Sequence, residues 1–537
     1  MVTMGRCIST ASRRQPTGRI SQGTISGEPT GVISQGSISG KSKRKRYASL
    51  FCYTYWPVSE YGVMCNRPQT ISSIHILDDD SLLHVFYLCQ PIFSGEDDFV
   101  GHSFSGWGSN EHWWYTLAHV CQGWRKIILR SATYLGLSLA CSYGTPVADM
   151  LANSPPLPLV VGYYKNDREL TADEEGIIIV LKQHGRVRRL RLSNAITIMK
   201  KLYAIMDEEY PILEVLYITR QIEDNSTIFT FPESFQAPHL RHLTLRGFAL
   251  PIGSRLLTSA VGLVTLDLDM AHPSTYFHPN TLIQWISLML HLKMLKIVFQ
   301  LPIPNRELER QLTNTSIITP ITLPNLHCLH FRGVSTYLES LVHRITAPRL
   351  EELQIEFFSQ LTFSLPRVPQ FINTIETPRF DSARVVFSDN LAGAAVYTHG
   401  ETVDVLSIVV KCQHLDWQVT SMAQICNSPG QIISAVERLL LQLSVHRSSS
   451  GEHNVVDRTE WRKLLRPFSN VKTLRIYGGI VKDLSHCLEL EDGEFPLELL
   501  PELRELEYRQ SRKSSDVFTS FIDARRNSGR PVTLVHL

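Results

Sequence analysis

The sequence predicts an α/β fold in which a small helical region is followed by an irregular solenoid, a curved parallel sheet with outer helices. Three observations predict this fold. The 537 residues are too many for one compact core. Two helical stretches with one apolar face lie before residue 130, and from residue 187 onward one short apolar pattern keeps returning.

The returning pattern has apolar residues at its first, fourth and sixth positions, as in Leu240-Arg-His-Leu-Thr-Leu. The last two apolar residues share one face of a short strand, and the residues between them point to the other face. Copies begin at Val187, Leu213, Leu240, Leu263, Leu292, Leu326, Leu350, Val471 and Leu503, with weaker ones at Phe380, Val403 and Val436 and a terminal one at Val532. The starts are about 23 to 35 residues apart, and leucine-rich repeats have a period of about 20 to 29 residues.

Helical stretches such as Thr281 to Leu290 and Tyr337 to Ile345 separate the strands and are long enough for parallel crossovers. One copy cannot bury its apolar side alone, so we expect residues 136–537 to stack into a leucine-rich-repeat-like solenoid. The strand after the helical region, with Thr145 to Val147 and Leu157 to Val161, follows the same pattern. The Asn or Cys that usually ends such repeats is mostly absent, which predicts an irregular arc. An ordinary α/β domain with Leu-rich strands is the alternative.

The helical region, residues 71–135, contains both amphipathic stretches. The first runs from Ser81 to Cys89, with apolar residues on one face at positions 82, 83, 86 and 89. Asp78 to Asp80 precede it, where a carboxylate caps free amides and favours the positive end of the helix dipole. Three consecutive aspartates point in divergent directions, so capping explains them better than metal binding. The second stretch runs from Trp113 to Ile128.

These stretches, Leu77-Asp-Asp-Asp-Ser-Leu-Leu-His-Val-Phe and Leu117-Ala-His-Val-Cys-Gln-Gly-Trp-Arg, resemble an F-box, most closely that of F-box-like proteins from mushroom-forming fungi. Segments that begin at Trp461, Leu499 and Phe521 resemble the C-terminal part of that family. The resemblance implies three short helices that dock a Skp-type adaptor and, through it, a cullin–RING ubiquitin ligase. The apolar residues that it implies for adaptor binding or for the core of the motif are Leu77, Leu82, Leu83, Val85, Phe86, Val120 and Trp124. Asp78 departs from the usual proline, and the loop between the helices is long.

Residues 1–70 are expected to be a disordered, low-complexity tail. Two similar Gly/Ser-rich stretches begin at Thr17 and Thr30, and such sequence buries too little apolar surface to offset its ordering entropy. Lys41 to Arg46 has the composition of a nuclear localisation signal or an acid-binding patch, and a solvated basic end to the tail is the alternative.

Composition argues against several classes of protein. Lys plus Arg (53) nearly balances Asp plus Glu (51), which disfavours a polybasic nucleic-acid-binding protein. The ten cysteines contain no Cys-x-x-Cys, which argues against zinc ribbons and thioredoxin-type redox motifs. Ten cysteines in a chain this long are not a disulfide framework, which favours a reducing, intracellular location in cytoplasm or nucleus. No segment reads as a membrane span. Gly36 to Ser42 is one residue short of a phosphate-binding loop, and Gly101 to Ser105 lacks the last glycine of a nucleophile elbow, so we expect neither an enzyme nor a cofactor.

The residues between the apolar positions of the strands are expected to line the concave face. This set contains Arg189, Arg191, Tyr217, His242, Arg246, Asp267, Asp269, Lys296, His330, Arg332, Glu352, Glu356, Arg384, Arg475 and Glu505. The target-binding residues predicted within it are Arg189, Arg191, Arg246, Asp267, Asp269, Arg332, Glu352 and Glu356. Basic and acidic groups alternate along the face, which suits a protein partner of complementary charge better than a nucleic acid. A merely solvated face is the alternative.

The sequence therefore predicts a substrate-recognition subunit of an SCF-type ubiquitin ligase. Its F-box would dock the adaptor, its repeats would bind a protein target, and the chain itself would catalyse nothing. The alternative is a leucine-rich-repeat interaction scaffold whose degenerate F-box no longer engages the ligase.

Overall fold

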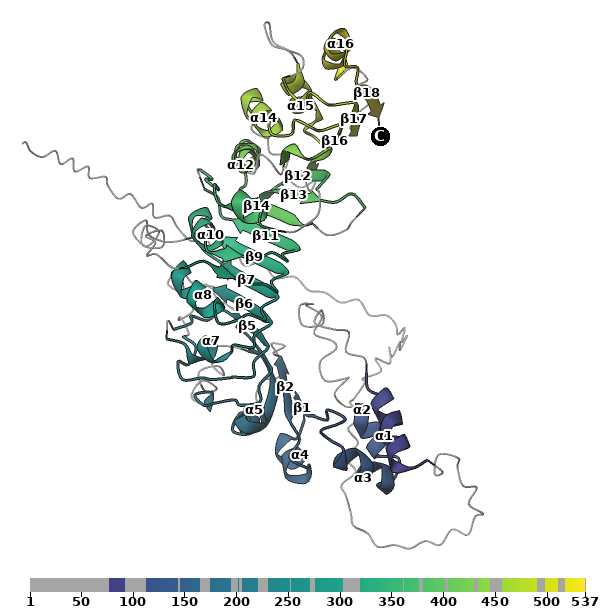
Figure 1. The fold of residues 1–537 in the computed structure, drawn as a ribbon, viewed down its shortest axis with the longest axis vertical. Coiled ribbons are helices and arrows are strands. Elements are labelled where there is room, and N and C mark those ends of the chain that lie inside the picture. Colours follow the sequence, from purple (N-terminus) through teal and green to yellow (C-terminus); the bar gives the residue numbers. More distant parts are fainter. Residues whose placement is uncertain are drawn as a thin grey trace, which may run out of the picture. The chain divides into compact units, whose positions relative to one another are not determined.

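The structure is a computed structural model that describes residues 77–91, 113–142, 145–164, 174–194, 201, 205–220, 230–251, 253–270, 276–302, 319–360, 362–375, 380–400, 404–428, 433–444, 456–489, 498–509 and 517–536 (Figure 1). The chain divides into two units, Met1–Ser72 and Ser73–Leu537, and every described residue belongs to the second. The expected tail over residues 1–70, with Lys41 to Arg46, lies outside the described residues, as does the loop over residues 92–112.

The secondary structure alternates strands and short helices. The described helices are α1 (Asp79–Leu88), α2 (Trp113–Ala118), α3 (Gln122–Arg130), α4 (Val147–Asn153), α5 (Glu174–Leu181), α7 (Arg255–Ser259), α8 (Pro279–Ile286), α10 (Ser335–Val342), α11 (Val368–Ile372), α12 (Leu415–Asn427), α14 (Arg458–Leu465), α15 (Val481–Leu488) and α16 (Thr519–Asn527). The described strands are β1 (Leu139–Ser142), β2 (Leu159–Tyr164), β3 (Val187–Asn194), β4 (Val215–Arg220), β5 (His242–Arg246), β6 (Thr265–Met270), β7 (Met294–Phe299), β8 (Ile321–Thr322), β9 (Cys328–Gly333), β10 (Ile345–Thr346), β11 (Glu352–Phe357), β12 (Ser382–Ser388), β13 (Leu391–Tyr397), β14 (Leu406–Lys411), β15 (Arg438–Ser444), β16 (Thr473–Tyr477), β17 (Glu505–Arg509) and β18 (Thr533–His536).

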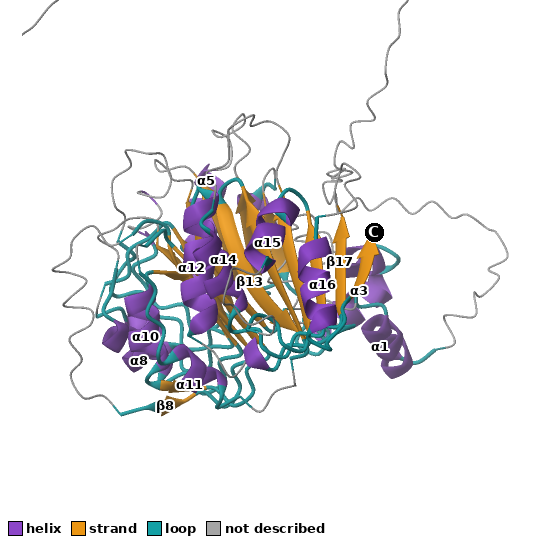
Figure 2. Ribbon diagram, turned by 90° about the horizontal axis from the view of Figure 1, so that it is seen from above, coloured by secondary structure: helices purple, strands orange, loops and turns teal. Residues whose placement is uncertain are grey.

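One large sheet of sixteen strands contains every described strand except β8 and β10, which pair with each other. Most of its neighbouring strands are parallel, and a strand follows every start predicted from the repeated pattern. Helices such as α8, α10, α12 and α14 lie along one side of the sheet, which confirms the predicted α/β fold with a large parallel sheet and outer helices (Figures 1 and 2). The segment Thr145 to Val147, predicted as strand, instead leads into α4, because Pro146 occupies the N-cap of that helix.

The alternation of side chains along each strand follows the repeated pattern. In β5, Leu243 and Leu245 are fully buried, whereas His242, Thr244 and Arg246 are half-buried on the opposite face. The first apolar residue of the pattern, Leu240, lies in the turn before β5 and is also fully buried. This copy therefore contributes three apolar side chains to the core, and burial of each one stabilises the fold by about 1.5–3 kcal/mol.

Backbone hydrogen bonds join consecutive copies at the point where each strand begins. The amide of Arg241 donates to the carbonyl of Glu214, that of Val264 to Arg241, and that of Lys293 to Val264, over N–O distances of 2.7 to 2.8 Å. The ladder continues through His327 to the amide of Glu351. These residues stand side by side along the edge of the sheet at which the strands begin, a row that we call the entry rim.

The sheet departs from chain order between β11 and β15. Its strand order there is β11-β14-β13-β12-β15, so β12 lies three places beyond β11 instead of next to it. Strands β12 and β13 form an antiparallel pair, as do β13 and β14, while β12 is parallel to β15 and β14 is parallel to β11. Helix α12, with 13 residues, packs over β13. The antiparallel strand β13 was not predicted, because Leu391 to Tyr397 does not carry the repeated pattern.

The second helical stretch is two helices rather than the single one predicted from Trp113 to Ile128. Helix α2 ends at Ala118, and Cys121 adopts an extended conformation with φ −158° and ψ 169°. Its Sγ accepts a hydrogen bond from the amide of Trp124 over 3.4 Å and so caps α3. A cap satisfies an amide that would otherwise lack a partner, which stabilises the new helix start.

The three N-terminal helices share their apolar core with the start of the sheet. Phe86 is fully buried and packs edge-to-face against Trp124, with ring centroids 4.9 Å apart. The indole Nε1 of Trp114 donates to the carbonyl of Ser138 next to β1, over 3.2 Å. Within the described ranges, no helix is both long enough and apolar enough to cross a lipid bilayer.

Candidate interaction surfaces

Helix α1 carries an apolar stripe that no described element covers. Val85 and Leu88, three residues apart, are 39% and 69% exposed, and Leu77, just before the helix, is 42% exposed. Leu77 precedes the N-cap Asp78, whose backbone is extended, so it adjoins the start of the helix and does not continue the helical face of Val85 and Leu88. Val120, in the turn between α2 and α3, is 58% exposed. We call Leu77, Val85 and Leu88 the α1 stripe.

The seven residues assigned to adaptor binding from the F-box resemblance divide by burial. Leu82 and Phe86 are buried among the three helices, whereas Leu83 and Trp124 are half-buried against the same core. The remaining three, Leu77, Val85 and Val120, are exposed. The resemblance allowed either role, and the burial assigns Leu82 and Phe86 to the core of the helical unit. Leu88, the most exposed apolar residue of α1, was not predicted, because the F-box resemblance in this helix ends at Phe86.

Of the three aspartates predicted to precede the helix, Asp78 caps α1, whereas Asp79 and Asp80 lie in its first turn, because the helix begins two residues earlier than predicted. Its Oδ1 accepts a hydrogen bond from the amide of Ser81 over 2.7 Å, and the hydrogen bonds from Ser81 lower the pKa of this carboxyl group. The cap places a negative charge one residue after Leu77. A protein partner of the α1 stripe must therefore accommodate a carboxylate at the start of the helix.

The second surface is the polar face of the sheet, opposite the face that packs against the core. The strand register aligns its side chains in rows that cross the strands. One row contains Arg191, Tyr217, Thr244, Asp267, Lys296, His330 and Gln354, and the next contains Arg246, Asp269, Val298, Arg332 and Glu356. All eight predicted target-binding residues lie on this face. We call this surface the polar sheet face.

Asp267 is the centre of the polar sheet face between β5 and β7. Its Oδ2 lies 3.1 Å from Nη2 of Arg246 and 3.7 Å from Nζ of Lys296. The Asp267 side chain is only 10% exposed, since both neighbouring strands place a cation over it. Asp267 and Arg191 were predicted to be exposed on the concave face, but both residues are buried, at 7% and 5%. Long side chains on adjacent strands are close enough to cover each other, and this covering depends on register.

Glu356 on β11 forms a second cluster of charges. Its Oε1 lies 3.4 Å from Nε of Arg332 on β9 and 2.9 Å from Nζ of Lys411 on β14. Lys411 was not predicted to belong to this cluster. The strand that follows β11 in the chain is β12, so nothing in the linear order of the repeats places β14 beside β11.

Other members of the face are also held by neighbours. The guanidinium carbon of Arg191 lies 4.4 Å from the centroid of the Tyr217 ring, a distance at which cation and ring attract. Asp269 accepts a hydrogen bond from Nε2 of Gln300 over 2.6 Å, while burial raises the pKa of the Asp269 carboxyl group. Burial and the adjacent Lys296 lower the pKa of His330.

The remaining predicted residues of the face lie at its margins. Arg189 is half-buried at the β3 end of the face, and Glu352 accepts a hydrogen bond from the side-chain amide of Gln354. Near the C-terminus, Nε of Arg475 lies 2.7 Å from Oε2 of Glu507. The polar sheet face is thus a set of local charge pairs, which suits recognition by hydrogen bonds and charge complementarity.

The described residues contain no group of three or more His, Cys, Asp or Glu side chains that could hold a metal ion. No protein-family model matches the chain, and no curated protein matches its sequence. The interpretation of both surfaces therefore depends on their own geometry.

Proposed function

We propose that the chain is the substrate-recognition subunit of an SCF-type E3 ubiquitin ligase. Helices α1–α3 act as an F-box that docks a Skp-type adaptor, which joins the chain to a cullin–RING ligase. The sheet with its outer helices acts as a leucine-rich-repeat solenoid that binds the protein to be modified. The chain itself catalyses no reaction in this proposal, and it works in the cytoplasm, the nucleus or both.

The α1 stripe is the observation that supports adaptor docking most directly. Soluble proteins keep large contiguous apolar patches covered, and exposed ones mark sites of protein interaction. Val85 and Leu88 point away from the core that Leu82 and Phe86 join, so the helix has one face for packing and another free for a partner. The helical unit therefore has a free face for an adaptor, and the long repeat sheet that follows it provides a separate surface for a target protein.

The polar sheet face supports target binding through its alternating charges. Its pairs run from Arg246 and Asp267 through Arg332 and Glu356 to Arg475 and Glu507, so both signs occur along its length. A protein with a complementary charge pattern can replace these internal ion pairs by ion pairs across the interface. A nucleic acid presents only negatively charged phosphates, so it can pair only with the basic groups.

The second candidate is an interaction scaffold that does not engage the ligase. Asp78 favours it, since this residue stands where the F-box family usually has proline and its carboxylate lies beside the α1 stripe. In that case the stripe would bind another protein, and the sheet would function without ubiquitin transfer.

The deciding experiment measures binding of the full chain to a purified fungal Skp-type adaptor by calorimetry. We compare the wild type with Val85→Asp and Leu88→Asp, which place charges on the α1 stripe without touching the core. Each change should weaken adaptor binding at least tenfold. The matched control is Leu301→Asp, because Leu301 is 48% exposed but lies after β7, far along the chain from the helical unit.

Equal binding by the wild type and the two stripe variants would show that the adaptor does not use this surface. A folded chain that fails to bind the adaptor at all would favour the scaffold. Thermal melts of all variants verify folding, and these exposed substitutions should change stability little.

A further inference from the structure

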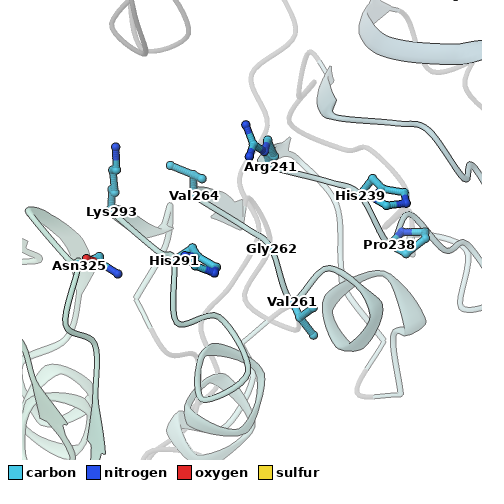
Figure 3. A pocket seen from close by; sticks show the side chains of 9 residues that line it. All are labelled: Pro238, His239, Arg241, Val261, Gly262, Val264, His291, Lys293 and Asn325. Atoms are coloured by element: carbon cyan, nitrogen blue, oxygen red, sulfur yellow. The ribbon is translucent and has the colours of Figure 1, made fainter.

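A pocket lies at the entry rim, where the turns before β5, β6, β7 and β9 meet (Figure 3). Its volume is about 690 Å³, within the range of ligand pockets, which is about 300 to 1,000 Å³. The pocket lies at the ends of strands, so it is separate from the α1 stripe and from the polar sheet face.

The four turns around the pocket close with the same backbone hydrogen bond. In each turn the amide of the first apolar residue of the copy donates to the carbonyl three residues earlier, over 3.1 to 3.3 Å, at Leu240, Leu263, Leu292 and Leu326. The residue before each of these leucines therefore occupies an equivalent position. These four residues form a row across the copies, and all of them line the pocket: His239, Gly262, His291 and Asn325.

Gly262 is the member of this row that has no side chain, and nothing around it requires glycine. Its φ lies outside the left-handed region, and an added Cβ would meet no described atom within 4 Å. Glycine also loses more conformational freedom on folding than any other residue. Gly262 therefore costs stability at this position, and the missing side chain opens the pocket between its neighbours in the row.

The opening at Gly262 has an imidazole on each side. His239 and His291 belong to the copies of β5 and β7, the two neighbours of β6, and both side chains are exposed (Figure 3). Adjacent parallel strands are about 4.8 Å apart, so the stems of the two histidines are about 10 Å apart across Gly262. A ring placed midway would lie about 5 Å from each imidazole, and aromatic pairs prefer centroid distances of about 4.5–7 Å. The gap therefore fits one aromatic side chain.

Valines and a cation belong to the same lining. Val261 and Val264 flank the glycine turn, and Val261 is 51% exposed, so the pocket offers apolar contact to a ring. Arg241 lines the pocket beside His239, is exposed, and forms no ion pair with any described residue. A carboxylate adjacent to the ring would give this guanidinium a partner, in the geometry that charge-assisted hydrogen bonds favour.

We propose that this pocket binds an aromatic side chain of a partner protein that stands next to an acidic residue. The ring lies between His239 and His291 at Gly262, and the neighbouring carboxylate pairs with Arg241. Small-molecule sites bury most of their ligand, whereas His239, Arg241 and His291 are exposed, so the pocket suits a side chain from a peptide segment better than a free small molecule. This site is independent of the proposed function, since it requires neither the adaptor nor the polar sheet face.

A nucleic acid fits this pocket less well. Its bases can stack on imidazoles, but its backbone carries a negative charge at every step. Glu214 and Glu351 lie along the same rim, and their carboxylates would repel a strand that followed it. A peptide needs only one acidic group, at Arg241.

The test is saturation-transfer difference NMR with the full chain and an unlabelled seven-residue peptide that has one Phe between two Asp residues and Gly or Ser elsewhere. This method detects weak binding and shows which ligand protons contact the protein. The Phe ring protons should receive the strongest saturation. A peptide with Ala in place of Phe should bind at least tenfold more weakly, and one with Asn in place of both Asp residues at least threefold more weakly.

Gly262→Phe fills the pocket with a ring from the chain itself and removes no charge, so it should lower peptide affinity at least tenfold. The matched control is Gly185→Phe, because Gly185 lies in the turn before β3 and an added Cβ there also meets no described atom within 4 Å. It should bind the peptide as the wild type does. Arg241→Gln should weaken binding at least threefold and reduce its salt dependence, since screening acts on exposed charges.

Thermal melts of both Phe variants verify folding. If Gly262→Phe unfolds, His239→Ala/His291→Ala removes both imidazoles instead and should give the same loss of affinity. Absence of wild-type binding, equal binding by the folded pocket variant, or equal binding of the Ala peptide would overturn the proposal. Tighter binding of a short DNA single strand than of the peptide, lost in the same variant, would assign the pocket to nucleic acid and overturn it too.

Discussion

The α1 stripe and the polar sheet face differ in what already surrounds their side chains. On α1, Leu88 is 69% exposed and gains burial only when a partner arrives. On the sheet, Asp267 is already held by Arg246 and Lys296. A partner of the stripe therefore adds new apolar contacts, whereas a partner of the sheet must replace contacts that exist.

Because of this difference, the α1 stripe is suited to binding affinity and the polar sheet face to selectivity between partners. Burial of exposed apolar surface contributes about 25 cal/mol for each Å², so a few side chains on α1 add substantial binding energy. Exchange of one charge pair for another adds little net energy but rejects partners with the wrong pattern. The two surfaces fit a constant partner at the helices and a selected partner at the sheet.

The largest expected effect tests the division of α1 into two faces. Phe86→Ala removes a fully buried ring that packs against Trp124 and should destabilise helices α1–α3 by about 3–5 kcal/mol. Val85→Ala, on the exposed face, should change their stability by less than about 0.5 kcal/mol. Amide hydrogen exchange of these helices measures both, and similar protection in the two variants would contradict the division.

The next effect tests whether the polar sheet face is held together by its own charges. Asp267→Ala leaves Arg246 and Lys296 facing each other without a carboxylate and should cost about 1–3 kcal/mol in the free energy of unfolding. Adding Lys296→Met should recover part of this loss, since one of the two repelling cations is removed. Urea denaturation of the single and double variants gives the coupling, and an additive result would show that the charges act independently.

A smaller effect concerns pH. The folded structure keeps the pKa of His330 below its usual value of 6.5, so the unfolded chain takes up this proton first. The contribution of His330 to stability is complete above about pH 6.5 and is lost as the pH falls from there toward the lower folded-state pKa. His330→Gln should flatten the decline in melting temperature over this range. His343, whose pKa is also lowered by burial and by Arg367, is unchanged in this variant, and an unchanged slope would refute the role of His330.

The smallest effect is expected at the margin of the polar sheet face. Lys411→Ala removes a cation whose side chain is 47% exposed, while Arg332 stays beside Glu356. Exposed ion pairs contribute about 0–1 kcal/mol, so unfolding should shift by no more than that. A loss as large as that of Asp267→Ala would mean that position on the face does not determine the strength of its pairs.

The sequence pattern predicted most of the sheet because every strand follows the same local rule. Leu243 and Leu245 are buried in β5 as the alternation requires, and the same spacing located strands as far as β18. The cap at Asp78 was predictable too, since it depends only on neighbours in the sequence. The predicted roles in adaptor and target binding remain predictions.

Features that depend on register or on strand order could not be predicted. The contact between Lys411 and Glu356 exists because β14, and not β12, lies next to β11 in the sheet. The repeated pattern contains no signal for this change in strand order. The break at Cys121 was hidden because the apolar spacing continues through it from α2 into α3. The alignment of Arg241, Val264 and Lys293 along the entry rim likewise depends on backbone hydrogen bonds between copies that are far apart in the sequence.

The insertion between β11 and β15 preserves the strand direction of the sheet because it contains two antiparallel pairings, and the second reversal cancels the first. Strand β14 runs with β11, β13 runs against it, and β12 again runs with β15. An insertion with a single antiparallel pairing would reverse the direction of every later strand, and the right-handed rule for parallel crossovers would then move the later helices to the other side. Strand β13 alone runs against its neighbours in the described sheet, so removing β13 would leave β11, β14, β12 and β15 all pointing the same way.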